Sequence, residues 1–344
     1  MSADVPAGTA GEPRVLATGV GSWPGEHPLE AARTVLGELA EHLPHLVELP
    51  ARGPGADMIG RAAALLVELP VDLQPSGWRL VDRPGRDLRR AHALRAADLD
   101  ALAEAADGWT GPLKVQVTGP WTLGAGVWLP RGERAVVDPG ARRDLVDSLA
   151  EGVAEHVRAV RRLVPGAQVV LQLDEPSLPA VLAGRLPTVS GFGRLRAIDP
   201  VEAEQGLRTV LEAGTAAGAV GTVVHCCAPD APRGLLRGAG AGGLSVDVSL
   251  LTPAGWESVA VAVEAGVALW AGAVPTSGAL PSAAAVVEAV RVPWRRLGLD
   301  TELLAGVVLT PACGLAAASP AQARTVLART VEAAGALTEV AAGG

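Results

Sequence analysis

The chain has 344 residues, 49% of them hydrophobic, and carries a formal net charge of −8. This mild acidity argues against nucleic acid as a partner, because phosphate binding requires clustered Lys and Arg, whereas the arginines here are scattered. Three cysteines do not make a disulfide framework, and no apolar run is long enough to cross a membrane, so we expect a cytoplasmic protein.

The predicted elements follow a flexible segment, residues 1–14, which is rich in Ala, Gly and Pro and has no signal-peptide core. From residue 15 onward, short β-branched runs alternate with longer helical patterns, which is typical of βαβ units around a parallel sheet. The predicted strands are 15–22, 46–50, 113–120, 168–177, 221–227, 243–250, 267–275 and 306–313. The predicted helices are 28–43, 56–69, 86–106, 141–164, 200–217, 253–265, 282–297 and 320–334. Eight such repeats predict a single (β/α)8 TIM-type barrel over residues 15–344.

A doubly wound open sheet is the alternative architecture. It would usually carry a phosphate-binding glycine turn after the first strand, but Pro24 interrupts the glycine-rich segment 19–25 and disfavours a dinucleotide site. The segment 121–140, after the third predicted strand, is predicted to be an extended lid or binding loop.

Polar side chains gather where the predicted strands end. In barrels the active site lies at the carboxyl ends of the strands, so these side chains would meet at one rim. They are Ser22, Glu48, Thr118, Asp174, Glu175, His225, Cys227, Asp247 and Cys313. Thiol, imidazole and carboxylate groups on otherwise apolar segments indicate a functional site.

His225 and Cys227 are two residues apart and therefore point to the same face of their strand, whereas Cys226 points to the opposite face. Taken alone, the pair is equally compatible with core packing. Cys313 ends the eighth predicted strand near the same rim, and three N and S ligands favour zinc. Asp247, on the neighbouring strand, is the best protein candidate for a fourth ligand, with a hydrogen-bonded structural role as the equal alternative.

Four segments resemble motifs of the cobalamin-independent methionine synthase catalytic barrel, and the resemblance runs from about Val15 to Ala334. They are Thr18–Pro24, Leu171–Pro176, Val224–Cys227 and Pro311–Leu315. The resemblance implies that His225, Cys227 and Cys313 are zinc ligands. It also implies that Ser22 and Asp174 hold the amino-acid end of homocysteine, with Asp174 as the catalytic residue.

Other positions depart from the family pattern. The family's zinc-ligating Glu corresponds to Asp247, and its acid after an Asp-Met-Val segment corresponds to Gly60. Its His general acid corresponds to Trp270, its folate-stacking Trp to about Gly126, and a further Glu to Ala180. The metal half of the site is therefore expected to be kept and the folate half changed.

Three functions stay open on this sequence. The first is methyl transfer to homocysteine from a donor other than folate, for which short single-barrel relatives imply a corrinoid protein as partner. The second is zinc-dependent alkyl transfer to another thiol. The third is a barrel that binds zinc without turnover, which the missing general acid at Trp270 favours. Uroporphyrinogen decarboxylase, whose barrel resembles that of this superfamily, is disfavoured because it needs neither a His-x-Cys pair nor a distant Cys.

Overall fold

The structure is a computed structural model that describes residues 14–343, so the predicted flexible segment 1–14 lies outside it except for Arg14. A curled, parallel, seven-stranded sheet has the strand order β1-β9-β8-β7-β6-β5-β4. Its strands are β1 (Leu16–Ala17), β4 (Gly111–Thr118), β5 (Ala167–Asp174), β6 (Gly221–His225), β7 (Gly243–Asp247), β8 (Ala268–Val274) and β9 (Val308–Pro311).

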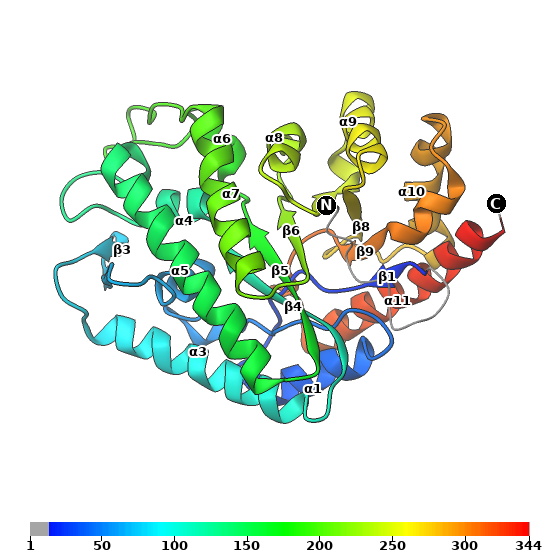
Figure 1. The fold of residues 1–344 in the computed structure, drawn as a ribbon, viewed down its shortest axis with the longest axis horizontal. Coiled ribbons are helices and arrows are strands. Elements are labelled where there is room, and N and C mark those ends of the chain that lie inside the picture. The colour runs from blue at the N-terminus through cyan, green and yellow to red at the C-terminus, as the bar shows by residue number, and fades with distance from the viewer. Residues whose placement is uncertain (1–13, 344) are drawn as a thin grey trace.

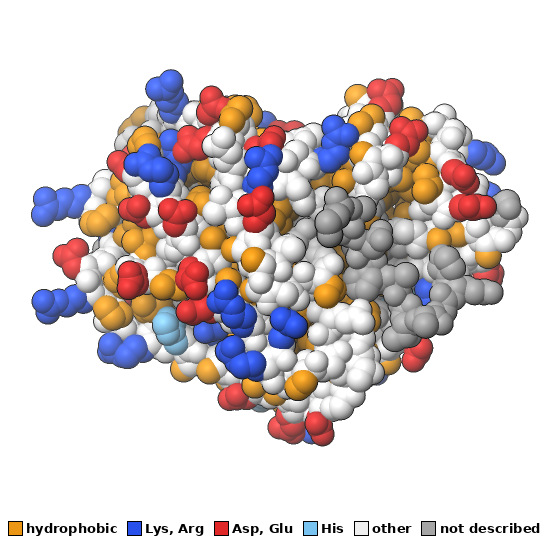
Figure 2. Space-filling model, viewed as in Figure 1, with side chains coloured by type: hydrophobic (Ala, Val, Ile, Leu, Met, Phe, Trp, Pro, Cys, Tyr) orange, Lys and Arg blue, Asp and Glu red, His pale blue; other side chains and the backbone are white. Residues whose placement is uncertain are grey.

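Helices lie around the outside of this sheet (Figure 1). They are α1 (Pro28–Glu38), α2 (Met58–Ala63), α3 (Arg86–Ala105), α4 (Pro120–Gly126), α5 (Pro139–Leu163), α6 (Leu178–Leu182), α7 (Pro200–Ala216), α8 (Arg233–Gly238), α9 (Pro253–Glu264), α10 (Ala283–Arg296) and α11 (Pro320–Ala342). On the face formed by α3, α5 and α7, acidic and basic side chains are interspersed (Figure 2). Over residues 14–343, no helix combines the length and the apolar character that a membrane crossing needs.

Local sequence explains where the main helices begin. Asp138, Asp199, Thr252 and Ser319 each precede a proline and accept a hydrogen bond from a backbone N–H of the first turn. Such a cap satisfies a donor that the helix cannot pair internally, and proline at the first position has the backbone angle already set. Three of these caps start α5, α7 and α9, which return the chain to the start of the next strand, and Ser319 starts the last helix, α11.

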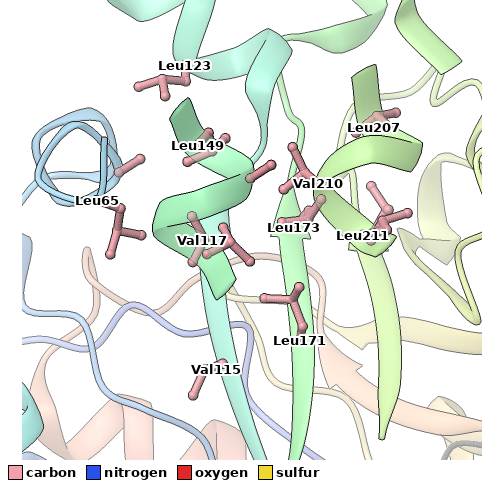
Figure 3. Packing of buried hydrophobic residues seen from close by; sticks show 14 of the residues in the cluster. Leu65, Val115, Val117, Leu123, Leu149, Leu171, Leu173, Leu207, Val210 and Leu211 are labelled. Carbon is pink, nitrogen blue, oxygen red and sulfur yellow. The ribbon is translucent and has the colours of Figure 1, made fainter. Parts of the chain in front are cut away.

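Alternation along the strands divides apolar from polar side chains. Val115 and Val117 on β4, with Leu171 and Leu173 on β5, face outward into the buried cluster beneath α5 and α7 (Figure 3). The intervening residues of β4 and β5 are polar and face the other side, where the strands curl around the interior. They are Lys114, Gln116, Gln172 and Asp174, and all are buried. The packing that fixes the sheet thus holds a polar interior beneath the ends of the strands.

The predicted second strand, residues 46–50, is not a regular strand. This segment makes only isolated parallel bridges, His45 to Lys114 and Ser22 to Glu48. Pro44 has no N–H to donate, and Pro50 begins the 3-10 helix Pro50–Arg52, so few residues are free to pair. The first predicted strand is shortened for a related reason, since residues 21–23 bond to Glu48 rather than to β9.

Two further differences concern the connections. The segment 121–140, predicted to be an extended loop, begins as helix α4 and continues through the 3-10 helix Ala135–Val137. An antiparallel hairpin of β2 (Val71–Gln74) and β3 (Gly77–Leu80), which was not predicted, follows α2. Its strands are short, and the hairpin is continued only by a bridge between Arg79 and the distant Trp128.

A buried ionic cluster joins α3 to α2 and to the segment before it. Asp98 on α3 accepts from Arg52 at 2.6 Å and also from Arg61, whose Nε lies 3.2 Å from Glu48. The Asp98 side chain is 1% exposed, so its removal would leave two buried guanidinium groups without their shared carboxylate. We expect Asp98→Asn to lower the free energy of unfolding by about 3–5 kcal/mol in chemical denaturation.

The matched control is the exposed pair between Arg33 and Glu104, whose side chains are 62% and 59% exposed. Exposed pairs contribute little, so Glu104→Gln should cost less than about 1 kcal/mol. Similar losses from the two variants would contradict the structural role assigned to the Asp98 cluster.

Candidate metal centre

Three potential metal ligands converge where β6 and β9 end. The ligand atoms of His225, Cys227 and Cys313 all lie within 4.8 Å of one another. The sulfurs of Cys227 and Cys313 are 3.4 Å apart although the residues are 86 positions apart in sequence. Two thiolates on one tetrahedral zinc, each about 2.3 Å from it, would lie about 3.8 Å apart, so the pair fits that ion with a small movement. The donor set is therefore suited to zinc.

His225 is oriented by a hydrogen bond behind it. Its Nδ1 lies 2.9 Å from the hydroxyl of Ser245 on β7, the residue paired with it in the sheet. Its Nε2 is buried and bonds to no group of residues 14–343. A metal-binding imidazole commonly uses one ring nitrogen for such a support and the other for the metal. The free Nε2 thus fits a metal ligand.

The two rim thiols influence one another. The hydrogen bond to Cys227 and the neighbouring His225 lower the pKa of Cys313 to about 4. The same hydrogen bond, together with burial, raises the pKa of Cys227. The pair therefore loses its first proton more readily than an ordinary thiol, and a thiolate is the form that binds a metal.

Cys226 lies apart from these thiols, as its place in the strand predicted. It is fully buried in the apolar cluster that also contains Val246 and Trp256. Burial raises its pKa to about 12, so this thiol stays protonated. Cys226 is a packing residue rather than a ligand.

Asp247 ends β7, next to the strand of His225, but its carboxylate is not grouped with the three converging ligand atoms. Its Oδ1 accepts from the backbone N–H of Ser249 at 2.9 Å and from the Ser249 hydroxyl at 2.6 Å. These bonds cap the 3-10 helix Val248–Leu250. The structure thus gives Asp247 the hydrogen-bonded role that the sequence left open as an alternative to zinc ligation.

Both predicted substrate-binding residues border the metal cluster. A Cβ added to Gly314 would lie 2.1 Å from the Ser22 hydroxyl, so Ser22 abuts the turn that carries Cys313. Asp174 is paired with His225 in the sheet and is 5% exposed. Burial raises its pKa to about 7, while its bond from Gln172 works in the opposite direction. A serine hydroxyl, a buried carboxylate and the three ligands therefore occupy one end of the sheet.

Glu175, next to Asp174, has a structural role. It accepts hydrogen bonds from the backbone N–H groups of Trp121 and Thr122 at 2.9 and 2.8 Å, and from the Thr122 hydroxyl at 2.7 Å. It thereby caps helix α4, while burial raises its pKa to about 7. Of the two adjacent acids, Glu175 is therefore occupied with capping a helix, whereas Asp174 caps none.

The positions that depart from the family pattern are closed by packing. At Gly60 an added Cβ would lie 2.7 Å from the Cα of Gly55, and at Gly126 it would lie 2.4 Å from Ile59. Trp270 is fully buried in an apolar cluster with Leu16 and Val223. At Gly60 and Gly126 a side chain would therefore require a rearrangement of its neighbours.

Three further residues lie around the site and were not predicted from the sequence. Ser245 supports His225, while Lys114 and Gln172 form a buried pair below Asp174. Ser245 lies two residues before Asp247 on the same strand and therefore shares its face. The available signal for Lys114 was its rarity, since it is the single lysine of the chain.

Comparison with known proteins places this fold and site in context. The chain matches the family model described as cobalamin-independent synthase, catalytic domain, over residues 15–336. A solved structure of a B12-independent methionine synthase from Shewanella sp. W3-18-1, in complex with selenomethionine, has a TM-score of 0.61 at 14% identity and covers 95% of this chain and 98% of that one. A BexX/CysO complex from Amycolatopsis orientalis has a TM-score of 0.39 at 14% identity, covering 98% of this chain and 96% of that one. No curated protein matches the chain.

The fold is thus that of the α/β, TIM-barrel-like methionine synthases. The chain belongs to the cobalamin-independent synthase catalytic-domain family, which confirms the resemblance. It is a methyltransferase, and membership indicates methyl transfer to homocysteine.

Proposed function

We propose that the protein is a zinc-dependent methyltransferase that converts homocysteine to methionine with a methyl donor other than folate. The convergence of His225, Cys227 and Cys313 within 4.8 Å, beside Asp174, carries this proposal. When bound, zinc would supply a Lewis acid that favours the thiolate form of the substrate sulfur, which is otherwise protonated near neutral pH. Overall, the sulfur gains the methyl carbon, its proton is released, and the bond between methyl and donor breaks with its electrons staying on the donor.

We infer that the sheet is a closed barrel of eight members. Residues 44–48 take the place of the second strand, and their bridges to Ser22 and Lys114 on the two sides support this. Closure would bring Ser22 and Asp174 around one opening. The three cysteines, all free, support the cytoplasm as the site of action.

Asp174 and Ser22 are proposed to hold the amino-acid end of homocysteine. A buried carboxylate beside the metal ligands is suited to a substrate ammonium, because opposite charges interact strongly away from bulk water. The hydroxyl of Ser22, which adjoins the Cys313 turn, is placed to accept from the ammonium or donate to the carboxylate. Asp247 remains a proposed fourth ligand. To bind zinc through Oδ1, it would have to give up its hydrogen bonds from Ser249.

The changed folate positions support a corrinoid protein as the methyl donor. Ile59 covers the backbone at Gly126, where the family pattern has a stacking Trp. Two nearby tryptophans do not replace it. Trp121 is buried and donates to the backbone carbonyl of Ala203, and the Trp128 ring is contacted by two guanidinium groups, those of Arg79 at 5.9 Å and Arg134 at 4.8 Å.

We expect Asp174→Asn to weaken homocysteine binding to the zinc-loaded protein by about 10- to 100-fold, because hydrogen bonds to charged groups contribute about 1.5–3 kcal/mol. The comparison ligand is 4-mercaptobutanoate, which is homocysteine without its amino group. Its affinity should change less than about twofold, since it cannot pair with Asp174. Titration calorimetry measures both, and equal weakening of the two thiols would rule out an ammonium-binding role.

The two other functions make different predictions. An alkyltransferase for another thiol would bind 4-mercaptobutanoate or a different thiol at least as well as homocysteine. A barrel that holds zinc without turnover would bind no thiol at the metal. Trp270 lies in the apolar interior and supplies no general acid. This is the one observation that favours a barrel that binds zinc without turnover.

A further inference from the structure

The single lysine of the chain is buried in the interior of the sheet. Lys114 lies on β4 with 0% of its surface exposed, although the chain has 29 basic residues in total and arginine fills every other such position. A buried ammonium is costly unless its donors are satisfied. Lys114 Nζ donates to the backbone carbonyl of Val20 at 2.7 Å and to Oε1 of Gln172 at 2.8 Å. Burial lowers its pKa to about 7.

Gln172 continues this contact to the candidate substrate carboxylate. Its amide nitrogen donates to Oδ1 of Asp174 at 2.7 Å and to the carbonyl of Val20 at 2.9 Å. A glutamine amide can flip and exchange its oxygen and nitrogen. Because a protonated Lys114 can only donate, its bond to Oε1 fixes the amide in the one orientation that directs N–H groups toward Asp174.

The Lys114–Gln172 pair also touches the second proposed substrate segment. Both side chains donate to the carbonyl of Val20, which stands two residues before Ser22. The pair therefore ties Asp174, at the end of β5, to the segment that carries Ser22 after β1. With Oδ1 of Asp174 engaged from below, the other carboxylate oxygen is left for a ligand.

We propose that Lys114, through Gln172, is a positioning residue that holds Asp174 and the Ser22 segment in register for the ammonium group of an amino-acid thiol. This inference rests on the proposed function. Lysine suits the position because its ammonium is a compact cation with several donors, whereas the guanidinium of arginine is planar and presents its donors in a fixed fork. Lys114 and Gln172 touch no proposed metal ligand through the hydrogen bonds of the described residues.

Calorimetry on zinc-loaded Lys114→Met tests the proposal. Methionine fills a similar volume but donates nothing, so homocysteine binding should weaken about tenfold while 4-mercaptobutanoate binding changes less than about twofold. Gln172→Met should cause the same loss of selectivity for homocysteine over 4-mercaptobutanoate. This second variant keeps the test possible if Lys114→Met does not fold. The control is Thr222→Val, which removes a partly buried hydrogen bond that the hydroxyl of Thr222 on β6 accepts from the backbone N–H of Gly242, just before β7. This variant should change neither affinity.

A second readout uses the unmodified protein. Labelling lysine with carbon-13 at Cε gives one side-chain resonance, because the chain has one lysine. This resonance should shift on addition of homocysteine and stay in place with 4-mercaptobutanoate. Two results would overturn the positioning role without affecting the proposed function. One is a lysine resonance that does not shift when homocysteine is added. The other is a Lys114→Met protein with the same ratio of homocysteine affinity to 4-mercaptobutanoate affinity as the wild type. If the wild-type protein binds neither thiol, the proposed function itself fails and this inference falls with it.

Discussion

Replacing Cys227 or Cys313 with serine is expected to remove nearly all bound zinc. Each replacement deletes one of the three ligand atoms that lie within 4.8 Å of one another. Loss of a group that merely supports a ligand typically costs 10- to 100-fold in metal affinity, so loss of a ligand should cost at least about 100-fold. Metal content after dialysis against a competing chelator, measured by mass spectrometry, should fall from about one zinc per chain to nearly none.

Two variants calibrate this loss. Cys226→Ser should retain zinc, because Cys226 lies in the apolar core away from the site, although the variant will be less stable. Ser245→Ala removes the hydrogen bond at Nδ1 of His225 and should weaken zinc binding by about 10- to 100-fold. Equal zinc loss from all three cysteine variants would show that the assignment of Cys226 to the core side is wrong.

Methyltetrahydrofolate is expected to support little or no methionine formation, whereas methylcobalamin, free or bound to a corrinoid protein, should support more. The physical reason is steric. The backbone at Gly126 is covered by Ile59, and Trp128 is 8% exposed and flanked by Arg79 and Arg134, so no described aromatic ring near these positions is free to stack on a pterin. Stacking on an aromatic surface contributes about 0.5–1.5 kcal/mol, so other lost contacts must account for most of the effect.

The measurement is methionine formed from homocysteine by the zinc-loaded protein with each donor in turn. The Cys313→Ser protein is the control for methyl transfer that occurs without the enzyme. Efficient turnover with methyltetrahydrofolate would mean that the loop following α4 builds a folate pocket by other contacts, and it would contradict the proposed donor.

Periodicity predicted the parts of the fold that depend on local sequence. The strands β4 to β8 fall where apolar alternation placed them, because their outward residues pack under the helices, as Figure 3 shows for β4 and β5. The second predicted strand was wrong because Pro44 and Pro50 lie at its two ends and leave few residues free to pair, which apolar periodicity does not register. His45 and Glu48 make only isolated bridges, to Lys114 and Ser22.

Helix α4 was missed for the same kind of reason. Residues 121–126 include two glycines and have little helical propensity of their own. The carboxylate that caps the helix, Glu175, lies more than fifty residues further along the chain. A buried, long-range cap of this kind leaves no local signal.

The three candidate metal ligands could be predicted from the sequence, whereas the residues that hydrogen-bond to the site could not. The strand-end rule predicted that His225, Cys227 and Cys313 would meet, because the carboxyl ends of parallel strands share one edge. The supporting bonds from Ser245 and Gln172 depend on the register between strands, which the sequence does not specify. Asp247 illustrates the limit: its position was foreseen, but its bond to Ser249 was not.

Zinc K-edge spectroscopy with and without homocysteine tests the central claim most directly. The zinc-loaded protein should show two sulfur neighbours, from Cys227 and Cys313, with nitrogen from His225 and lighter atoms completing the shell. Homocysteine should add one sulfur neighbour, whereas homoserine, its hydroxyl analogue, should not. If homocysteine leaves the number of sulfur neighbours at two, the metal does not engage the substrate thiol and the proposed methyl-transfer site is contradicted.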